Sequence, residues 1–260
     1  MILTADYHTH TVFSHGKGNI LDNANVAKNK GLIQVGISDH GFSHPAFGLS
    51  TRKLPKMRKL CDEASSLTKV EVLLGIESNI IGVDGTTDLN PKNYDYFDIF
   101  LAGIHKFVLY KVGTAFSLFV PNFFYSTLKK KDVPKSLIKE NTKTYVNVIK
   151  NNPVDVITHL NFCCYADPVE VAKAASDYGT YIELNSKKVH LTDCELSDIV
   201  AKTSVNFVID SDAHRPDLVG DYSLVLDTFK RIDIDENRIH NVNGRLPTFR
   251  FKKFKEKAGA

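Results

Sequence analysis

Histidines and carboxylates that could bind metal ions recur along most of this chain. The candidates are His8, His10, His15, His40, Glu77, His105, His159, Asp212 and His214. Neutral imidazole nitrogens bind zinc, iron or manganese, and carboxylates add charge and can bridge two ions. A tetrahedral site needs four ligands, and a catalytic one leaves a position for water. Nine candidates, at roughly three per ion, therefore predict two or three divalent transition-metal ions (Zn, Mn or Fe).

Each of these residues also has a structural interpretation. A single histidine at the end of a strand is more often a hydrogen-bonded core or rim residue than a ligand. So many histidines placed alike are not explained in this way, because burying them without partners costs free energy. His44, His190 and His240 lie outside the pattern and are expected at the surface or behind the ligands. Asp39 and Asp210 are expected to orient ligands or to support the fold.

Two basic residues stand next to candidate ligands. Lys106 follows His105 and Arg215 follows His214. Both are candidate contacts for a phosphate group, and for both a solvent-facing charge is an equally good interpretation.

Short apolar runs lead into nearly all of the candidate ligands. The runs cover residues 1–7, 34–38, 71–76, 98–104, 154–158, 181–184 and 205–209. Their continuous, β-branched character is typical of strands buried on both faces. Helix-like stretches at 20–31, 52–67 and 168–179 lie between them. This alternation predicts a parallel α/β barrel of about seven or eight strands, whose carboxyl ends meet at one mouth.

One connection is longer than a strand-to-strand crossover requires. It contains an aromatic-rich stretch at 107–124, the three lysines 129–131 and a helix-like stretch at 135–150. Because it begins directly after His105, residues 107–150 are expected to form a lid or a wall of the mouth. A pair of helices packed on the side of the barrel is the alternative.

Composition favours one soluble domain over residues 1–260. Hydrophobic residues make up 43% and charged residues 24% of the chain, which is ordinary for a globular enzyme. The apolar runs are too short to span a bilayer, and the four cysteines lack disulfide or CxxC spacing. We therefore expect a cytoplasmic protein without a membrane partner. The formal net charge of +3 is concentrated in residues 248–260, a basic tail expected to be a solvated terminus.

The motifs together resemble a known family. They are Tyr7-His8-Thr9-His10-Thr11, Ile37-Ser38-Asp39-His40-Gly41, Gly75-Ile76-Glu77-Ser78-Asn79, Val83-Asp84-Gly85, Ala102-Gly103-Ile104-His105, Thr158-His159 and Ser211-Asp212-Ala213-His214. This series is similar to the PHP (polymerase and histidinol phosphatase) superfamily, and most of all to its small stand-alone phosphatases. The resemblance implies a distorted seven-stranded (β/α)7, TIM-like barrel with the metal site at the carboxyl ends of the strands.

The resemblance also implies a ligand assignment for three metals. His8, His10, Glu77 and Asp212 would hold the first, His15, His40 and His214 the second, and His105 and His159 the third. Glu77 would bridge the first and third ions. All nine positions carry a residue able to act as a ligand, which argues against an inactivated member of the family.

The expected activity is metal-dependent hydrolysis of a phosphoester, with a metal-held hydroxide as the nucleophile and a small phosphomonoester as the substrate. A nuclease acting on single-stranded nucleic acid is the nearest alternative, because the same ions could cleave a phosphodiester. A histidinol-phosphate phosphatase and a non-catalytic regulatory module are the others. The sequence does not indicate an oligomeric state.

Overall fold

A computed structural model describes residues 1–125 and 133–258 of the chain as a barrel of seven parallel strands. The strands are β1 (Ala5–Thr9), β2 (Gln34–Ile37), β3 (Glu71–Asn79), β4 (Ile99–Gly103), β5 (Val156–Ile157), β6 (Tyr181–Asn185) and β7 (Phe207–Asp210), and they are hydrogen-bonded in chain order. A parallel bridge between Thr9 and Ala213 brings β1 beside the chain leaving β7. The predicted distorted (β/α)7 barrel is therefore confirmed.

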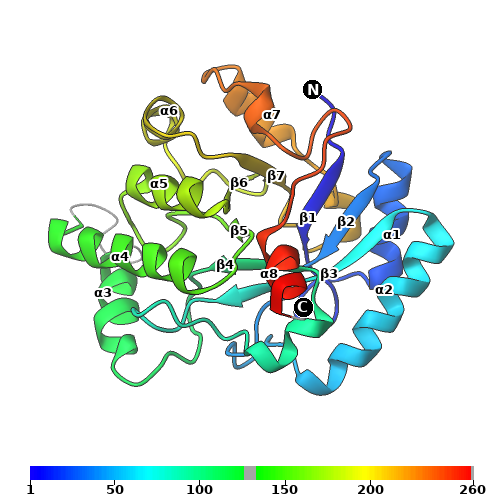
Figure 1. The fold of residues 1–260 in the computed structure, drawn as a ribbon, viewed down its shortest axis with the longest axis horizontal. Coiled ribbons are helices and arrows are strands. Elements are labelled where there is room, and N and C mark those ends of the chain that lie inside the picture. Colours follow the sequence, from blue (N-terminus) through cyan, green and yellow to red (C-terminus); the bar gives the residue numbers. More distant parts are fainter. Residues whose placement is uncertain (126–132, 259–260) are drawn as a thin grey trace.

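Helices surround the strands, as Figure 1 shows. They are α1 (Ile20–Asn29), α2 (Leu54–Thr68), α3 (Val120–Phe123), α4 (Lys135–Asn151), α5 (Pro168–Tyr178), α6 (Asp193–Lys202), α7 (Ser223–Phe229) and α8 (Arg250–Ala258). The expected helices lie within a few residues of α1, α2, α4 and α5. Their ends have local causes: Asn19 forms a capping box with Asp22 at the start of α1, and Gly179 takes a left-handed φ of 71° at the end of α5.

Two apolar clusters fill the fold. The larger lies between the sheet and the helices and includes Ile37, Leu74 and Ile199. The smaller draws its residues from β1 and from β4 to β7, with the partly buried Leu73 of β3 packed against it, so it occupies the barrel interior: Ala5, Tyr7, Ile99, Leu101, Val156, Tyr181 and Val208. Side chains alternate along a strand, so the positions two and four residues further on face the same interior above this apolar layer.

The long connection after β4 has two parts. Residues 115–123 form a π-helical turn followed by α3, and α4 packs beside α5 within the surrounding layer of helices. The Asn122 and Asn141 side chains exchange two hydrogen bonds of 2.8 Å and so tie α3 to α4. The lysines at 129–131 lie outside the described residues. A lid or wall formed by residues 107–150 stays a prediction.

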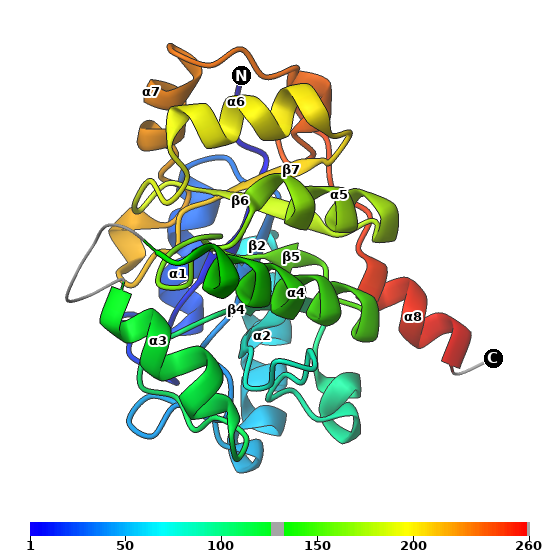
Figure 2. The ribbon, with the colours of Figure 1, turned by 90° about the vertical axis from the view of Figure 1, so that its left-hand side faces the viewer.

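The basic tail is more ordered than the sequence suggested. It forms α8, which lies across the end of the barrel opposite α3 (Figure 2). The fully buried Phe251 anchors it, and the Phe251 backbone N–H donates to Asp155 at 2.8 Å. Lys252, Lys253 and Lys257 stay exposed. The exposed lysines agree with the expected solvated terminus, and the buried Phe251 side chain docks the helix on the barrel. None of the helices within 1–125 and 133–258 is long and apolar enough to cross a membrane.

Candidate metal centre

The nine predicted ligands come together at the carboxyl ends of the strands. His8 and Glu77 lie within β1 and β3, and the other seven follow the ends of strands directly or within a few residues. A register shift in β1 between Asp6 and Thr9 interrupts the alternation there, and His8 and His10 face the interior above Tyr7. His159 and Asp212 adopt positive φ angles of 29° and 49°. Such backbone strain is typical of functional sites.

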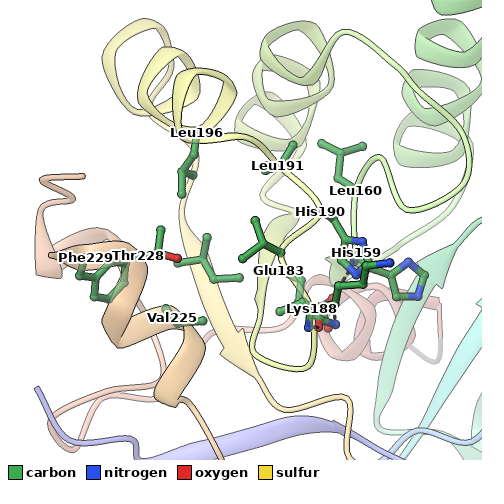
Figure 3. A pocket seen from close by; sticks show the side chains of 13 residues that line it. His159, Leu160, Glu183, Lys188, His190, Leu191, Leu196, Val225, Thr228 and Phe229 are labelled. Carbon is green, nitrogen blue, oxygen red and sulfur yellow. Dashed lines mark hydrogen bonds between the residues drawn. The ribbon is translucent and has the colours of Figure 1, made fainter. Parts of the chain in front are cut away.

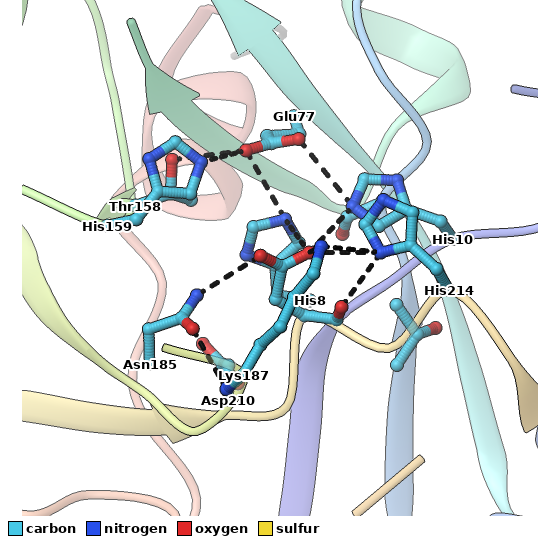
Figure 4. A network of polar contacts seen from close by, with 12 residues as sticks. His8, His10, Glu77, Thr158, His159, Asn185, Lys187, Asp210 and His214 are labelled. Carbon is cyan, nitrogen blue, oxygen red and sulfur yellow. Dashed lines mark hydrogen bonds and ion pairs between the residues drawn. The ribbon is translucent and has the colours of Figure 1, made fainter. Parts of the chain in front are cut away.

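Glu77 contacts several histidines of the group, and Figure 4 shows it together with His8, His10 and His159. Its Oε1 is 2.9 Å from His105 Nε2 and 2.7 Å from His159 Nε2. Its Oε2 is 2.8 Å from His40 Nδ1 and 3.6 Å from His10 Nε2. A single carboxylate therefore faces histidines from four different segments of the chain.

Asp212 faces the same space from the other side. Its Oδ1 lies 3.4 Å from His10 Nε2 and 3.3 Å from His214 Nδ1. His15 closes the group, because its ring stacks on His40 with centroids 4.8 Å apart and lies 4.2 Å from His214. The site thus contains all nine residues.

The charges of the group favour ionised carboxylates, and neutral imidazoles at His10 and His105. At His8 and His159 the neighbouring carboxylates, chiefly Glu77, outweigh burial and raise the pKa. Burial alone would raise the pKa of Glu77, but the neighbouring His105, His8 and His40 outweigh it and hold that pKa well below its usual value. Burial lowers the pKa of His105 to about 4, and burial together with His40 lowers that of His10 well below its usual value. Deprotonated carboxylates and neutral imidazoles are the forms that bind metals.

Several buried polar atoms in the group have no hydrogen-bond partner among the described residues. They include His8 Nε2, both ring nitrogens of His10, His40 Nδ1 and Glu77 Oε2. Leaving such atoms unpaired is costly, and their arrangement suits a bound cation. Three overlapping sets have ligand atoms within 4.8 Å of one another: His10, His40 and His214; His8, His10 and Glu77; and His40, Glu77 and His105. The residues present therefore fit divalent metal ions.

A second carboxylate, which the sequence reasoning missed, supports the ligands. The buried Glu183 in β6 accepts from His8 Nδ1 at 2.6 Å, from the His159 backbone N–H at 2.6 Å and from Asn185 Nδ2 at 3.0 Å. A carboxylate behind a metal-binding imidazole fixes its tautomer and orientation. Alternation along β6 was the available signal, since Glu183 lies two residues before the strand-end Asn185 and shares its face.

Lys187 is a second residue that the sequence reasoning missed. Its Nζ lies 3.2 Å from Asp212 Oδ1 and 3.0 Å from His214 Nδ1. The two basic residues proposed from the sequence lie elsewhere: the Arg215 guanidinium pairs with the exposed Asp217, and Lys106 is half-buried outside the lining of the cavity. For both, a phosphate contact stays a prediction.

Comparisons with known proteins agree with this geometry. The PHP domain pattern matches residues 6–188. A "probable phosphatase" of Thermoanaerobacter sp. (strain X514) is 31% identical over 275 residues, covering 100% of this chain and 98% of that protein. A "probable phosphatase" of Vibrio parahaemolyticus is 29% identical over 256 residues, covering 92% and 88%. The chain belongs to the PHP family.

A solved structure of another protein has the same fold as this PHP chain. The histidinol phosphate phosphatase of Lactococcus lactis, complexed with zinc, L-histidinol and phosphate, superposes with a TM-score of 0.62 over 95% of this chain and 100% of that one. The sequence identity is 14%, so this likeness concerns the fold alone.

Other PHP-like motifs have supporting roles. Asp39 accepts hydrogen bonds from the Thr11 backbone and hydroxyl and from the Ser14 hydroxyl, which fixes the loop between His10 and His15. Gly85 has a φ of 89°, and a Cβ there would lie 2.5 Å from the backbone of Asn147 in α4, so this glycine allows the turn to pack on the helix.

The remaining polar residues also have identifiable partners. Asp210 accepts from the Tyr7 backbone N–H at 2.7 Å, a structural contact as expected. His44 accepts from the Phe47 backbone, and His240 lies 3.0 Å from the Tyr181 hydroxyl. His190, which was expected at the surface or behind the ligands, lines the cavity beside them.

Proposed function

We propose that this PHP protein is a metal-dependent phosphomonoesterase that acts on small phosphorylated molecules. The observation that carries the proposal is the convergence of nine candidate ligands, several with unpaired buried nitrogens, beside a cavity of about 300 Å³ that seven of them line. A cavity of this size is at the lower end of the range for small-molecule sites. The names of the relatives, "probable phosphatase", agree with the reaction class.

The proposed metal content is three divalent ions, of zinc, manganese or iron. His8, His10, Glu77 and Asp212 would hold the first, His15, His40 and His214 the second, and His105 and His159 the third, with Glu77 shared by the first and third. The contacts of Glu77 support this sharing, because its Oε1 faces His105 of the third set and its Oε2 faces His10 of the first set. When bound, such ions neutralise phosphate oxygens and supply hydroxide as a nucleophile at neutral pH.

The chain itself would supply binding and orientation. Glu183 holds the His8 ring through Nδ1 and leaves Nε2 directed at the site. Lys187 places a cation beside Asp212 and His214, where it would contact an oxygen of the reacting phosphate. A lysine in this position adds charge stabilisation as a compact point charge on a flexible stem.

One experiment separates this proposal from the alternatives. Protein loaded with Zn, Mn or Fe, and its chelated form, would be assayed on small phosphomonoesters and on short single-stranded oligonucleotides, with metal content measured by elemental analysis. We expect two or three ions per chain, hydrolysis of monoesters above oligonucleotides, and loss of activity on chelation.

Each other outcome assigns a different function. A preference for oligonucleotides would replace the proposal with a nuclease. Activity confined to histidinol phosphate would identify a histidinol-phosphate phosphatase. Three bound ions without hydrolysis of any phosphoester would indicate a regulatory PHP module.

A further inference from the structure

The cavity beside the metal centre has an uneven distribution of charge. Its only carboxylates among the described residues are Glu77 and Asp212, both members of the ligand set. Beyond the ligands, its lining consists of Lys187, Lys188, Phe162 and His190. The part of the cavity that would receive the rest of a substrate is therefore basic and carries no acidic side chain.

Hydrogen bonds hold the backbone of Lys187 and Lys188 in place. Asn185, at the end of β6, accepts hydrogen bonds from the backbone N–H groups of Lys187 and Lys188 at 3.0 and 3.1 Å. The Ser186 N–H donates to the Asp210 carbonyl at 2.8 Å and ties the same turn to the end of β7. A short, hydrogen-bonded turn therefore presents both side chains at the mouth.

The two lysine side chains diverge from this turn. Lys187 reaches Asp212 and His214 within the ligand set. Lys188 is exposed, makes no ion pair with another described residue, and lines the cavity near His159 and His190 (Figure 3). Lys187 thus contacts the candidate metal ligands, and the Lys188 ammonium is available to the non-reacting part of a bound substrate.

A second chamber behind Lys188 limits where that part can go. The chamber adjoins the cavity at His159, Lys188 and His190, and its lining includes Leu196 and Val225 (Figure 3). Its volume of about 40 Å³ has room for only a few water molecules. The non-reacting part of a substrate would therefore stay in the outer cavity, within reach of the Lys188 ammonium and the exposed edge of Phe162.

We propose that Lys188 is a specificity-determining residue that selects phosphomonoesters carrying a second anionic group, a carboxylate or a phosphate. This inference rests on the proposed phosphomonoesterase function and deepens it. Ammonium-bearing leaving groups, such as that of histidinol phosphate, would meet a like charge here instead of a carboxylate partner. Like charges brought together in a partly desolvated cavity repel, so such substrates are disfavoured.

The test uses matched alkyl phosphates on metal-loaded protein. The three-carbon probes are 3-phosphooxypropanoate, propyl phosphate and 3-aminopropyl phosphate, which end in a carboxylate, a methyl and an ammonium group. Their four- and five-carbon homologues cover differences in reach. We expect kcat/KM to fall in the order carboxylate, methyl, ammonium, with about tenfold between the first two, as for a partly exposed charged contact.

Two variants assign the selectivity to Lys188. Lys188→Met should reduce the carboxylate-to-methyl ratio of kcat/KM to near one, and Lys188→Glu should invert the order in favour of the ammonium probe. Lys202→Met, at the end of α6 and outside the cavity lining, is the matched control and should keep the wild-type ratio.

The outcomes are distinguishable from failure of the proposed function. If none of the probes or other monoesters is hydrolysed by metal-loaded protein, the phosphomonoesterase proposal fails. If the probes are hydrolysed with equal kcat/KM, or if Lys188→Glu keeps the wild-type order, the role of Lys188 is wrong although the phosphatase assignment stands.

Discussion

Replacing Glu183 by glutamine tests whether the metal centre depends on a residue that is not itself a ligand. The wild-type carboxylate accepts from His8 Nδ1 through Oε1 and from the His159 backbone N–H through Oε2, both at 2.6 Å. Because a carboxylate only accepts, the His8 proton is placed on Nδ1 and Nε2 is left free for a metal. A glutamine has a single accepting oxygen, so one of the two N–H groups must face an amide donor.

The magnitude follows from these contacts. Losing one charge-assisted hydrogen bond in a buried site costs about 1.5–3 kcal/mol. Loss of a carboxylate behind a metal-binding histidine lowers metal affinity or activity by about 10- to 100-fold, which is the same range of free energy. We therefore expect Glu183→Gln to weaken binding of the tightest ion by about 10- to 100-fold and to lower kcat/KM to a similar extent.

Competition with a chromophoric chelator measures the affinity, and urea unfolding of the metal-free protein measures the stability. Glu170→Gln on α5, which alters an exposed carboxylate paired with Lys173, is the matched control and should change neither metal affinity nor activity. If Glu183→Gln binds metal as tightly as the wild type while the metal-free protein stays folded, the orienting role is wrong. If the metal-free variant is unfolded, Glu183 is primarily a structural residue.

Three further predictions concern other parts of the molecule. His40→Ala and His214→Ala should each remove a metal ion and reduce turnover by orders of magnitude. His240→Ala should leave metal content and rate nearly unchanged. Equal effects of all three substitutions would contradict the assignment of ligands by position. Phe251→Ala should lower the free energy of unfolding in urea by about 3–5 kcal/mol, and a loss below about 1 kcal/mol would show that α8 is not anchored by this side chain. Burial raises the pKa of Asp155 from 3.8 to about 7. Between about pH 4 and pH 7 the unfolded chain therefore ionises this carboxyl more readily than the folded one, and the contribution of Asp155 to stability falls as the pH rises. Urea unfolding across this range should show the wild type losing stability relative to Asp155→Asn, and a constant difference would refute the assignment.

The long segment after β4 shows how far pattern reasoning reached. The helical periodicity of residues 135–150 located α4 to within a residue. It did not reveal that α4 packs beside α5, since amphipathicity indicates that a face is buried but not against what. The aromatic stretch before it contains a π-helical turn, Ala115–Phe119, that the sequence did not predict.

The basic tail shows what composition alone does not predict. Five basic residues in residues 248–260 indicated a solvated terminus, and most of those charges are indeed exposed. The helix forms nonetheless, because Phe251 is buried and its backbone is held by Asp155, a residue 96 positions away in sequence. Composition describes the surface of such a segment and carries no information on a distant docking site.

What the sequence determined by itself was the barrel and the set of candidate metal ligands. Strand and helix periods are local, and ligand residues at the ends of buried runs must converge once parallel strands form one sheet. What only the tertiary structure decided was which groups stand behind and beside those ligands. Glu183 is one more polar residue in a strand, and Lys187 and Lys188 are ordinary lysines in a loop. Their roles depend on distances across the barrel, to His8 from Glu183 and to Asp212 from Lys187, and those distances exist only after the strands have closed around the centre.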